Sequence, residues 1–187
     1  MRVPQFVAIP LLATMAVAAC KDGAPTSSAS SSRASAAKHS SAGASTATVT
    51  IPPTGGFSSQ VLSRSRFLDD IDVKFRIKLD RATTVVHVSD PSDVVMAKVT
   101  FQPGGALPWH THPGPAIVSV ATGELTIIHA EDCVVRRYPA GTGLVDPGQG
   151  EVHIGFNASA VETVVYVTYL DVPPGQAPLV PAPEPDC

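Results

Sequence analysis

The chain has 187 residues and a formal net charge of −3 at pH 7, from 13 Lys and Arg against 16 Asp and Glu. The sequence shows no basic patch and no stripe of Lys or Arg interleaved with aromatic residues, which argues against nucleic acid as a partner.

The first 19 residues have the pattern of a signal peptide. Arg2 gives a positive start, and the apolar run from Phe6 to Ala19 is too short for a comfortable membrane span. The run ends in Val17-Ala18-Ala19-Cys20, which resembles the lipobox of bacterial lipoproteins. The resemblance implies cleavage before Cys20, lipid on that cysteine and an exported protein anchored to a membrane. The alternative is an ordinary secretory signal that releases the protein into the periplasm or to the cell surface.

Residues 20–49 are predicted to be a flexible tether. Between Thr26 and Thr48, Ser and Ala account for 16 of 23 residues, and no apolar period is visible. The folded domain is expected over residues 50–174, followed by a Pro-rich tail over residues 175–187.

The domain is predicted to be all-β. Residues 71–79 alternate apolar and charged side chains without a fault, as expected of a strand with one buried face. Residues 60–67 are either an edge strand or a short turn of helix. Short strands separated by turn residues favour a sandwich or a barrel. The further expected strands are 83–89, 93–101, 116–121, 124–130, 133–138, 143–146, 151–156 and 161–170.

Three histidines follow two Gly/Pro turns. His110 and His112 are two residues apart, so on a strand they point the same way, and His153 follows the turn 146–150. Neutral imidazole is a common ligand of transition metals, so these residues predict a site for one divalent ion, which could be Fe, Mn, Ni, Cu or Zn. The alternative is a polar cavity in which the histidines are hydrogen-bonded and no metal is bound.

These residues resemble the two motifs of the cupin superfamily. Gly104, His110, His112 and Gly123 fall at the positions of the first motif, and Gly150, His153 and Asn157 at those of the second. The resemblance covers roughly residues 70–170 and implies a single antiparallel β-barrel of jelly-roll type. It also implies that His110, His112 and His153 bind a metal inside the barrel. Asn157 is expected to shape the pocket, or else to hydrogen-bond the backbone of a turn.

The motif's glutamate is missing. Its position is Ala116, or Ile117 in the longer spacing. Three neutral imidazoles leave a divalent ion with a charge of +2, which should attract an anionic ligand. Glu151 lies two residues before His153, so on a regular strand it would share that histidine's face and could serve as a ligand or an acid/base, or it could lie in solvent.

The cysteine count fits lipidation. If Cys20 carries lipid, Cys133 and Cys187 remain as an even pair in an oxidising compartment, and a disulfide between them would fix the tail to the barrel. The alternative is two free thiols.

Three functions remain open from the sequence. The first is a metal-dependent enzyme, for example an oxygenase, acting on a small anionic or aromatic molecule. The second is a non-catalytic lipoprotein module that binds a metal or small molecule. The third is a structural barrel whose sheet edges pair in a homodimer and whose histidines are vestigial. Fold alone does not decide among them.

Overall fold

The structure is a computed structural model that describes residues 50–79 and 82–187. These residues form twelve strands and no helix. None of the described segments is therefore a helix long and apolar enough to cross a membrane. The strands are β1 (Gly55–Arg66), β2 (Asp72–Leu79), β3 (Ala82–Ser89), β4 (Asp93–Ala106), β5 (His110–Thr111), β6 (Ala116–Thr122), β7 (Glu124–His129), β8 (Val135–Pro139), β9 (Gly143–Asp146), β10 (His153–Phe156), β11 (Thr163–Val172) and β12 (Val180–Pro181).

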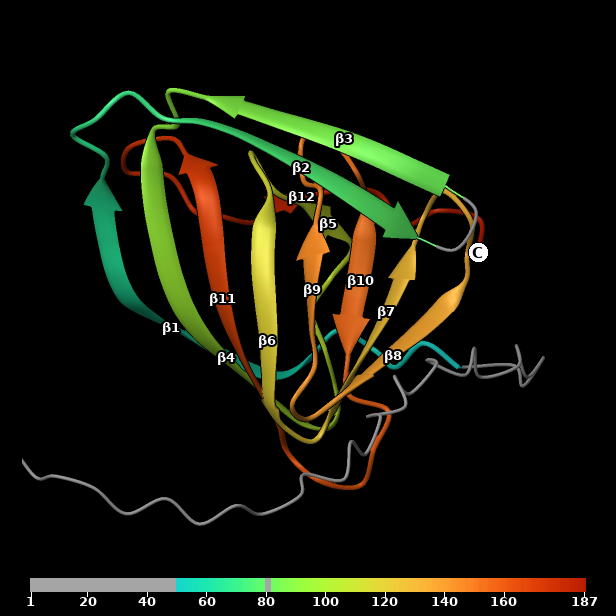
Figure 1. Ribbon diagram of the computed structural model, residues 1–187. Coiled ribbons are helices and arrows are strands. Elements are labelled where there is room, and N and C mark those ends of the chain that lie inside the picture. The colour runs from blue at the N-terminus through green and yellow to red at the C-terminus, as the bar shows by residue number, and fades with distance from the viewer. Residues whose placement is uncertain (1–49, 80–81) are drawn as a thin grey trace, which may run out of the picture. The chain divides into compact units, whose positions relative to one another are not determined.

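Ten strands form one antiparallel sheet that curls into a nearly closed barrel (Figure 1). One side consists of β1, β4, β11, β6 and β9 in that order, and the other of β8, β7, β10, β5 and β12. The two sides join where Phe156 of β10 pairs with Ala106 of β4. This arrangement confirms the predicted all-β jelly-roll barrel.

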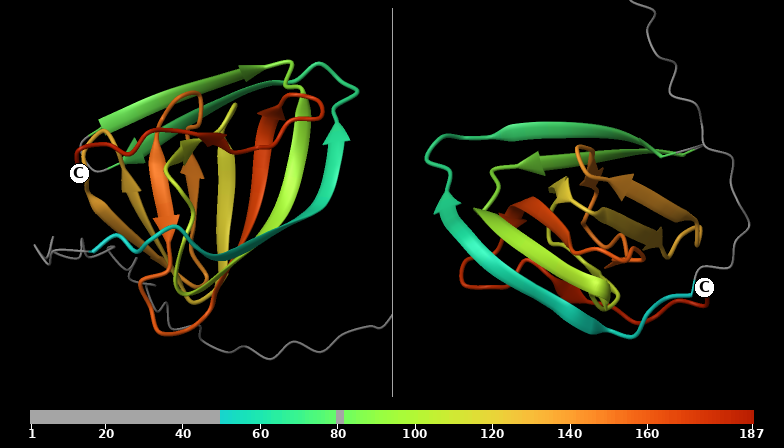
Figure 2. Two further views of the ribbon diagram at one scale, coloured as in Figure 1. Left: turned by 180° about the vertical axis from the view of Figure 1, so that it is seen from behind. Right: turned by 90° about the horizontal axis from the view of Figure 1, so that it is seen from below.

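The strands β2 and β3 form a separate hairpin that lies across one end of the barrel (Figures 1 and 2). The predicted alternation of β2 is confirmed, because Val73, Phe75 and Ile77 are partly buried and the charged residues between them are exposed. The side-chain amide of Gln149 donates a hydrogen bond of 3.2 Å to the carbonyl of His87, which connects the hairpin to the turn before β10. This is the end of the barrel at which β9 finishes and β10 begins (Figure 1).

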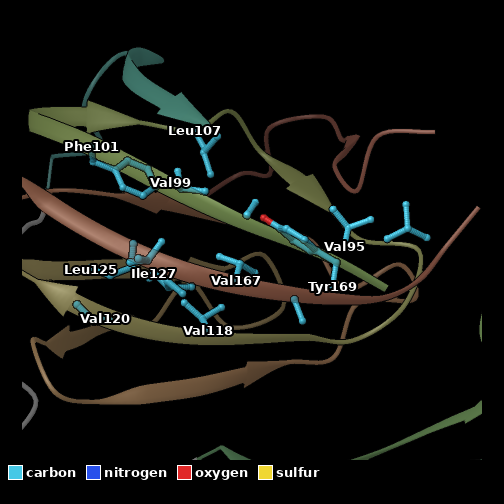
Figure 3. Close-up of a cluster of buried hydrophobic side chains, with 14 residues drawn as sticks. Val95, Val99, Phe101, Leu107, Val118, Val120, Leu125, Ile127, Val167 and Tyr169 are labelled. Carbon is cyan, nitrogen blue, oxygen red and sulfur yellow. The ribbon is translucent and has the colours of Figure 1, made fainter. Parts of the chain in front are cut away.

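The inward faces of β4, β6, β7 and β11 make the main core (Figure 3). Along β4, residues from Asp93 to Phe101 alternate between buried and more exposed, as the period-two pattern requires. The strand is longer than the sequence predicts and continues through Gly104 and Gly105 to Ala106. The labelled core side chains in Figure 3 are Val95, Val99, Phe101, Leu107, Val118, Val120, Leu125, Ile127, Val167 and Tyr169.

The segment 60–67 belongs to an edge strand, not to a turn of helix. β1 pairs along β4 from Gly55 opposite Ala106 to Arg66 opposite Asp93, and almost all of its residues are exposed. Because β4 supplies hydrogen bonds along nearly all of β1, the extended conformation is favoured there.

The Pro-rich tail is packed against the barrel. Cys133 and Cys187 form a disulfide with a Cα–Cα distance of 5.5 Å, as the cysteine count predicts. Within the tail, β12 pairs with β5, placing Val180 opposite Thr111 and Pro181 opposite His110. The tail therefore lies directly beside the strand that carries the first histidine. The predicted signal peptide, the lipidation site Cys20 and the tether over residues 20–49 lie outside the described residues.

Candidate metal centre

The three predicted histidines converge inside the barrel. His110, His112 and His153 are each at most 5% exposed. Each imidazole has one ring nitrogen that lies within 4.8 Å of a ring nitrogen of each of the other two. The ring centroids are 4.4 Å apart for His110 and His153, and 4.9 Å apart for His110 and His112. Three neutral nitrogens at this spacing can hold one divalent ion.

Strand register explains the convergence. His153 begins β10 and pairs directly with His110 of β5, so both side chains point to the same face of the sheet. His112 lies two residues after His110 and returns to that face. Residues that are about 40 positions apart in the chain therefore become neighbours only through the antiparallel pairing.

The turns that carry the two motifs are in contact. Gly148 has a φ of +61°, and a Cβ atom at this position would collide with the carbonyl oxygen of Gly114. Next to it, the amide of Gln149 donates a 2.8 Å hydrogen bond to the carbonyl of His112. Glycine is needed here both for the left-handed backbone and for the close approach. This contact fixes the distance between the two histidine-bearing segments.

Main-chain carbonyls orient His110 and His112. The Nδ1 atom of His110 is 2.7 Å from the carbonyl oxygen of Pro108, and Nδ1 of His112 is 2.9 Å from that of Pro178. A carbonyl oxygen can only accept a hydrogen bond, so both Nδ1 atoms must carry the proton. Each neutral ring then keeps the lone pair of Nε2 free to bind a metal.

A carboxylate orients His153. Its Nδ1 atom is 3.1 Å from Oδ2 of Asp146 and 3.8 Å from Oε2 of Glu151. Asp146 is 1% exposed, and its other oxygen accepts a 2.8 Å hydrogen bond from the amide of Gly148. A carboxylate behind an imidazole raises the basicity of the ring's other nitrogen and is common behind metal-bound histidines.

Burial keeps the imidazoles neutral. It lowers the pKa of His112 to about 4, with a further contribution from nearby His110. Burial also lowers the pKa of His110, and it lowers that of His153 well below the usual value, where the other histidines add to the effect. Burial disfavours a charged imidazolium, so at neutral pH the three rings present lone pairs instead of positive charges.

A small cavity lies against the three histidines. It has a volume of about 40 Å³ and is lined mainly by core side chains, among them Val99, Leu125 and Ile127. Beside the histidines, its polar lining includes Asp146 and Tyr169. A single water needs about 10–15 Å³ measured in this way, so the cavity has room for a few waters or a very small ligand.

The structure separates the two other predicted pocket residues. Glu151 lies next to the site, but on the Nδ1 side of His153, where its carboxylate contacts Nδ1 of His129. Asn157 follows β10 at the opposite end from His153 and does not line the cavity. Its side-chain amide donates to the backbone carbonyls of Val161, Gln102 and Phe101, at 2.7, 3.2 and 3.3 Å. The turn role given as the alternative for Asn157 is therefore the one observed, and the pocket role is wrong.

Three residues near the site were missed by the sequence analysis. Asp146, His129 and Tyr169 received no role in the site, because they lie in the predicted turn 146–150 and in the predicted strands 124–130 and 161–170. Tyr169 packs against His112 with ring centroids 5.0 Å apart, and His129 pairs with His153 from the neighbouring strand β7. Only Asp146 had a signal, its place in the turn before His153, because the pairing of β7 with β10 and of β11 with β4 and β6 is invisible in a single sequence.

No family model matches the chain, and no curated protein matches it either. Among solved structures, it is similar to a recombinant oxalate oxidase in complex with glycolate, with 31% identity over 47% of this chain and 45% of that chain at a TM-score of 0.39. It is also similar to a cupin domain from Bordetella pertussis Tohama I, with 21% identity over 64% of this chain and 98% of that chain at a TM-score of 0.42.

A cupin-2 domain protein from Shewanella frigidimarina NCIMB 400 is similar at 20% identity over 40% of this chain and 68% of that chain, with a TM-score of 0.34. The match to the oxalate oxidase covers less than half of that protein's length. The chain's own strand pairing and the position of its two histidine motifs assign its fold. The described domain is a single antiparallel β-barrel of jelly-roll type.

Proposed function

We propose that His110, His112 and His153 bind one divalent metal ion and that the protein is a metal-dependent enzyme acting on a small anionic molecule. The observation that carries the proposal is the convergence of three buried imidazoles whose Nδ1 atoms all face oxygen: two donate to main-chain carbonyls, and the third lies 3.1 Å from the Asp146 carboxylate. Their Nε2 atoms are thus the free ligands.

The donor set fits a divalent transition ion. Fe, Mn, Ni, Cu and Zn all accept imidazole nitrogen, and three protein ligands leave positions for water or substrate. Such an ion supplies Lewis acidity and, if it is redox-active, electron transfer to or from dioxygen. The protein's own contribution is to hold three neutral nitrogens on one side of an apolar cavity and to fix their tautomers.

The cavity favours a small anionic ligand. Its volume of about 40 Å³ admits only a few non-hydrogen atoms beside the histidines. The proposed site has no carboxylate among its three ligands, so a bound ion keeps its full charge of about +2 and attracts an anion. Burial raises the pKa of the Tyr169 phenol, so its hydroxyl stays protonated and can donate a hydrogen bond to that anion. Figure 3 shows this hydroxyl oxygen among the core side chains of the barrel interior.

A non-catalytic metal- or ligand-binding module is the second candidate. The observation in its favour is the apolar lining, because apart from the three histidines the polar side chains at the cavity are few, and Asp146 is bonded to Gly148 and faces Nδ1 of His153. A site without a free acid or base binds more readily than it transfers protons.

We also propose that the protein is exported and held at a membrane by lipid on Cys20. The lipobox-like Val17-Ala18-Ala19-Cys20 supports the anchor. The Cys133–Cys187 disulfide supports an oxidising compartment, since disulfides persist mainly outside the cytosol.

Elemental analysis of the purified, untagged protein tests the metal site. The expected result is a divalent transition metal in the wild type, with one ion per chain fewer in His110→Ala. The control is His87→Ala, because His87 lies on the β2–β3 hairpin and contacts Asp72 outside the cavity. Wild-type protein that binds none of the five metals after their addition would overturn the proposal.

Turnover then separates the two candidates. The protein loaded with each metal is incubated with oxalate or glycolate in air, and dioxygen consumption and product are measured. Turnover that disappears in His110→Ala supports the enzyme. A tightly held metal with no turnover of any small carboxylate favours the binding module.

A further inference from the structure

A second group of metal-binding side chains lies beside the three histidines. His129, Asp146 and Glu151 each offer a ligand atom, and these three atoms lie within 4.8 Å of one another. The group comes from three places in the chain, namely the end of β7, the end of β9 and the turn before β10. None of these side chains belongs to the three-histidine group.

His153 stands between the two groups. It pairs with His110 on one side and with His129 on the other. Its Nε2 is the free ligand for the first group, while its Nδ1 faces Asp146 at 3.1 Å and Glu151 at 3.8 Å. Four ligands around a tetrahedral ion at about 2.1 Å are about 3.4 Å apart, which is close to these separations.

Four buried atoms of this group make no hydrogen bond. Two are Nε2 of His129 and Oε2 of Glu151, and the other two, Nδ1 of His153 and Oδ2 of Asp146, face each other at 3.1 Å without hydrogen-bond geometry. His129 is 4% exposed, Asp146 1% and His153 5%, so water cannot readily satisfy them. Four such polar atoms within one buried group would be costly unless something binds them.

The charges point to the same conclusion. Asp146 is buried and Glu151 is partly buried beside it, and two such carboxylates need either a shared proton or a cation between them. The residues that face the pair are two imidazoles, and these are themselves good metal ligands.

We propose that the barrel holds a second divalent-cation site, formed by His129, Asp146, Glu151 and Nδ1 of His153. His153 then binds one ion through each ring nitrogen, and its remaining N–H proton is released to solvent, which leaves a bridging imidazolate. The second ion neutralises the two carboxylates. Mixed nitrogen and carboxylate ligands suit Zn²⁺. The proposal shares His153 with the three-histidine site and in that respect rests on the proposed function.

Zn²⁺ stoichiometry tests the second site. The metal-free, untagged protein is titrated with Zn²⁺, and the number of ions per chain is read by native mass spectrometry. The expected result is two Zn²⁺ per chain for the wild type. His129→Ala and the nearly isosteric Glu151→Gln should each retain one ion, and so should His110→Ala. Circular dichroism checks that each variant keeps the β-sheet spectrum, and His87→Ala should still bind two ions.

Each other outcome has a defined meaning. One Zn²⁺ per chain in the wild type, lost in His110→Ala but kept in His129→Ala, overturns the second site and leaves the three-histidine site standing. One ion that is lost in both variants also overturns it, because His129 and its neighbours then act only by positioning His153. No Zn²⁺ in the wild type overturns the second site, and the proposed function is overturned as well if the other four metals are not bound either.

Discussion

The two sides of the three-histidine group hold their ligands differently. On the β5 side, His110 and His112 are oriented by uncharged carbonyls, those of Pro108 and of Pro178 in the tail. On the β10 side, His153 faces carboxyl groups, those of Asp146 and Glu151. The same ligand type is therefore supported by neutral dipoles on one side and by acidic groups on the other.

This difference affects the metal affinity of each ligand and the parts of the chain on which each ligand's orientation depends. A carboxylate behind an imidazole increases the ring's donor strength, so His153 should be the strongest of the three ligands. A carbonyl fixes only the tautomer and the orientation. The carbonyl of Pro178 also belongs to a segment joined to the barrel by β12 and a disulfide, so the support of His112 depends on the tail staying in place.

The largest effect is expected for His153→Ala. This change removes the ligand with the carboxylate support and breaks the contact between the two groups of metal-binding side chains. We expect complete loss of stoichiometric metal from the purified protein, measured by elemental analysis, with the β-sheet circular dichroism spectrum unchanged. A variant that keeps full metal occupancy would show that His153 is not a ligand.

Asp146→Asn should have the next largest effect. The amide keeps the shape of the carboxyl group but cannot act as an anionic partner of Nδ1 of His153, so we expect the metal affinity to fall by about 10- to 100-fold. Competition with a chromophoric chelator measures the dissociation constant. The matched control is Glu162→Gln, an exposed carboxylate that accepts a hydrogen bond from Gln102 and should leave the affinity unchanged. Equal affinities for wild type and Asp146→Asn would remove the distinction between the two sides.

Loss of the disulfide tests the β5 side. The double change Cys133→Ser and Cys187→Ser opens a crosslink across 54 residues, so we expect the free energy of unfolding to fall by about 4 kcal/mol. Urea unfolding measures this loss. The metal affinity should fall less than in Asp146→Asn, by about threefold to tenfold at most, because one neutral hydrogen bond to His112 is weakened.

The opposite order of the two losses in metal affinity would reverse the comparison between the β5 side and the β10 side. If removal of the disulfide weakened metal binding more than Asp146→Asn, the tail and not the carboxylate would be the main support of the site. The same chelator competition on both variants decides this point.

The sequence predicts the strands and the histidine pair because both depend on short-range patterns, while the closed barrel and the place of His153 inside it are what the resemblance to cupins implies. The alternation in residues 71–79 marks a half-buried strand, and the spacing of His110 and His112 places them on one face whatever the partner strand is. Likewise, Cys133 and Cys187 could be paired by counting cysteines. These inferences need no knowledge of which strand lies next to which.

The residues around the site could not be predicted, because their positions depend on which strands are neighbours. His129 becomes a neighbour of His153 only through the pairing of β7 with β10, and the tail reaches His112 only through β12 and β5. Asn157 was misplaced because the four residues from His153 carry it along β10 to the other end of the barrel. Strand pairing is a long-range choice that a single sequence does not specify.

The smallest effect concerns protons at His112. Burial lowers its pKa in the folded protein to about 4, below the ordinary value of about 6.5. Between these two pH values the unfolded chain binds a proton at His112 and the folded chain does not, so this residue's contribution to stability is complete above pH 6.5 and is lost as the pH falls toward 4. The imidazole of the metal-free protein should therefore stay largely neutral down to about pH 5.

NMR titration of the metal-free protein checks this expectation directly. The Cε1 proton of His112 should titrate with a midpoint near pH 4. A midpoint near 6.5 would mean that water reaches the ring and that the β5 side is open to solvent. A neutral His112 at pH 5 also predicts that metal binding survives mild acid, because protons then compete little for its Nε2. In that case His112 on the β5 side would offer an unprotonated Nε2 to the metal even in mild acid. His153 on the β10 side, supported by a carboxylate, would contribute more to the metal affinity.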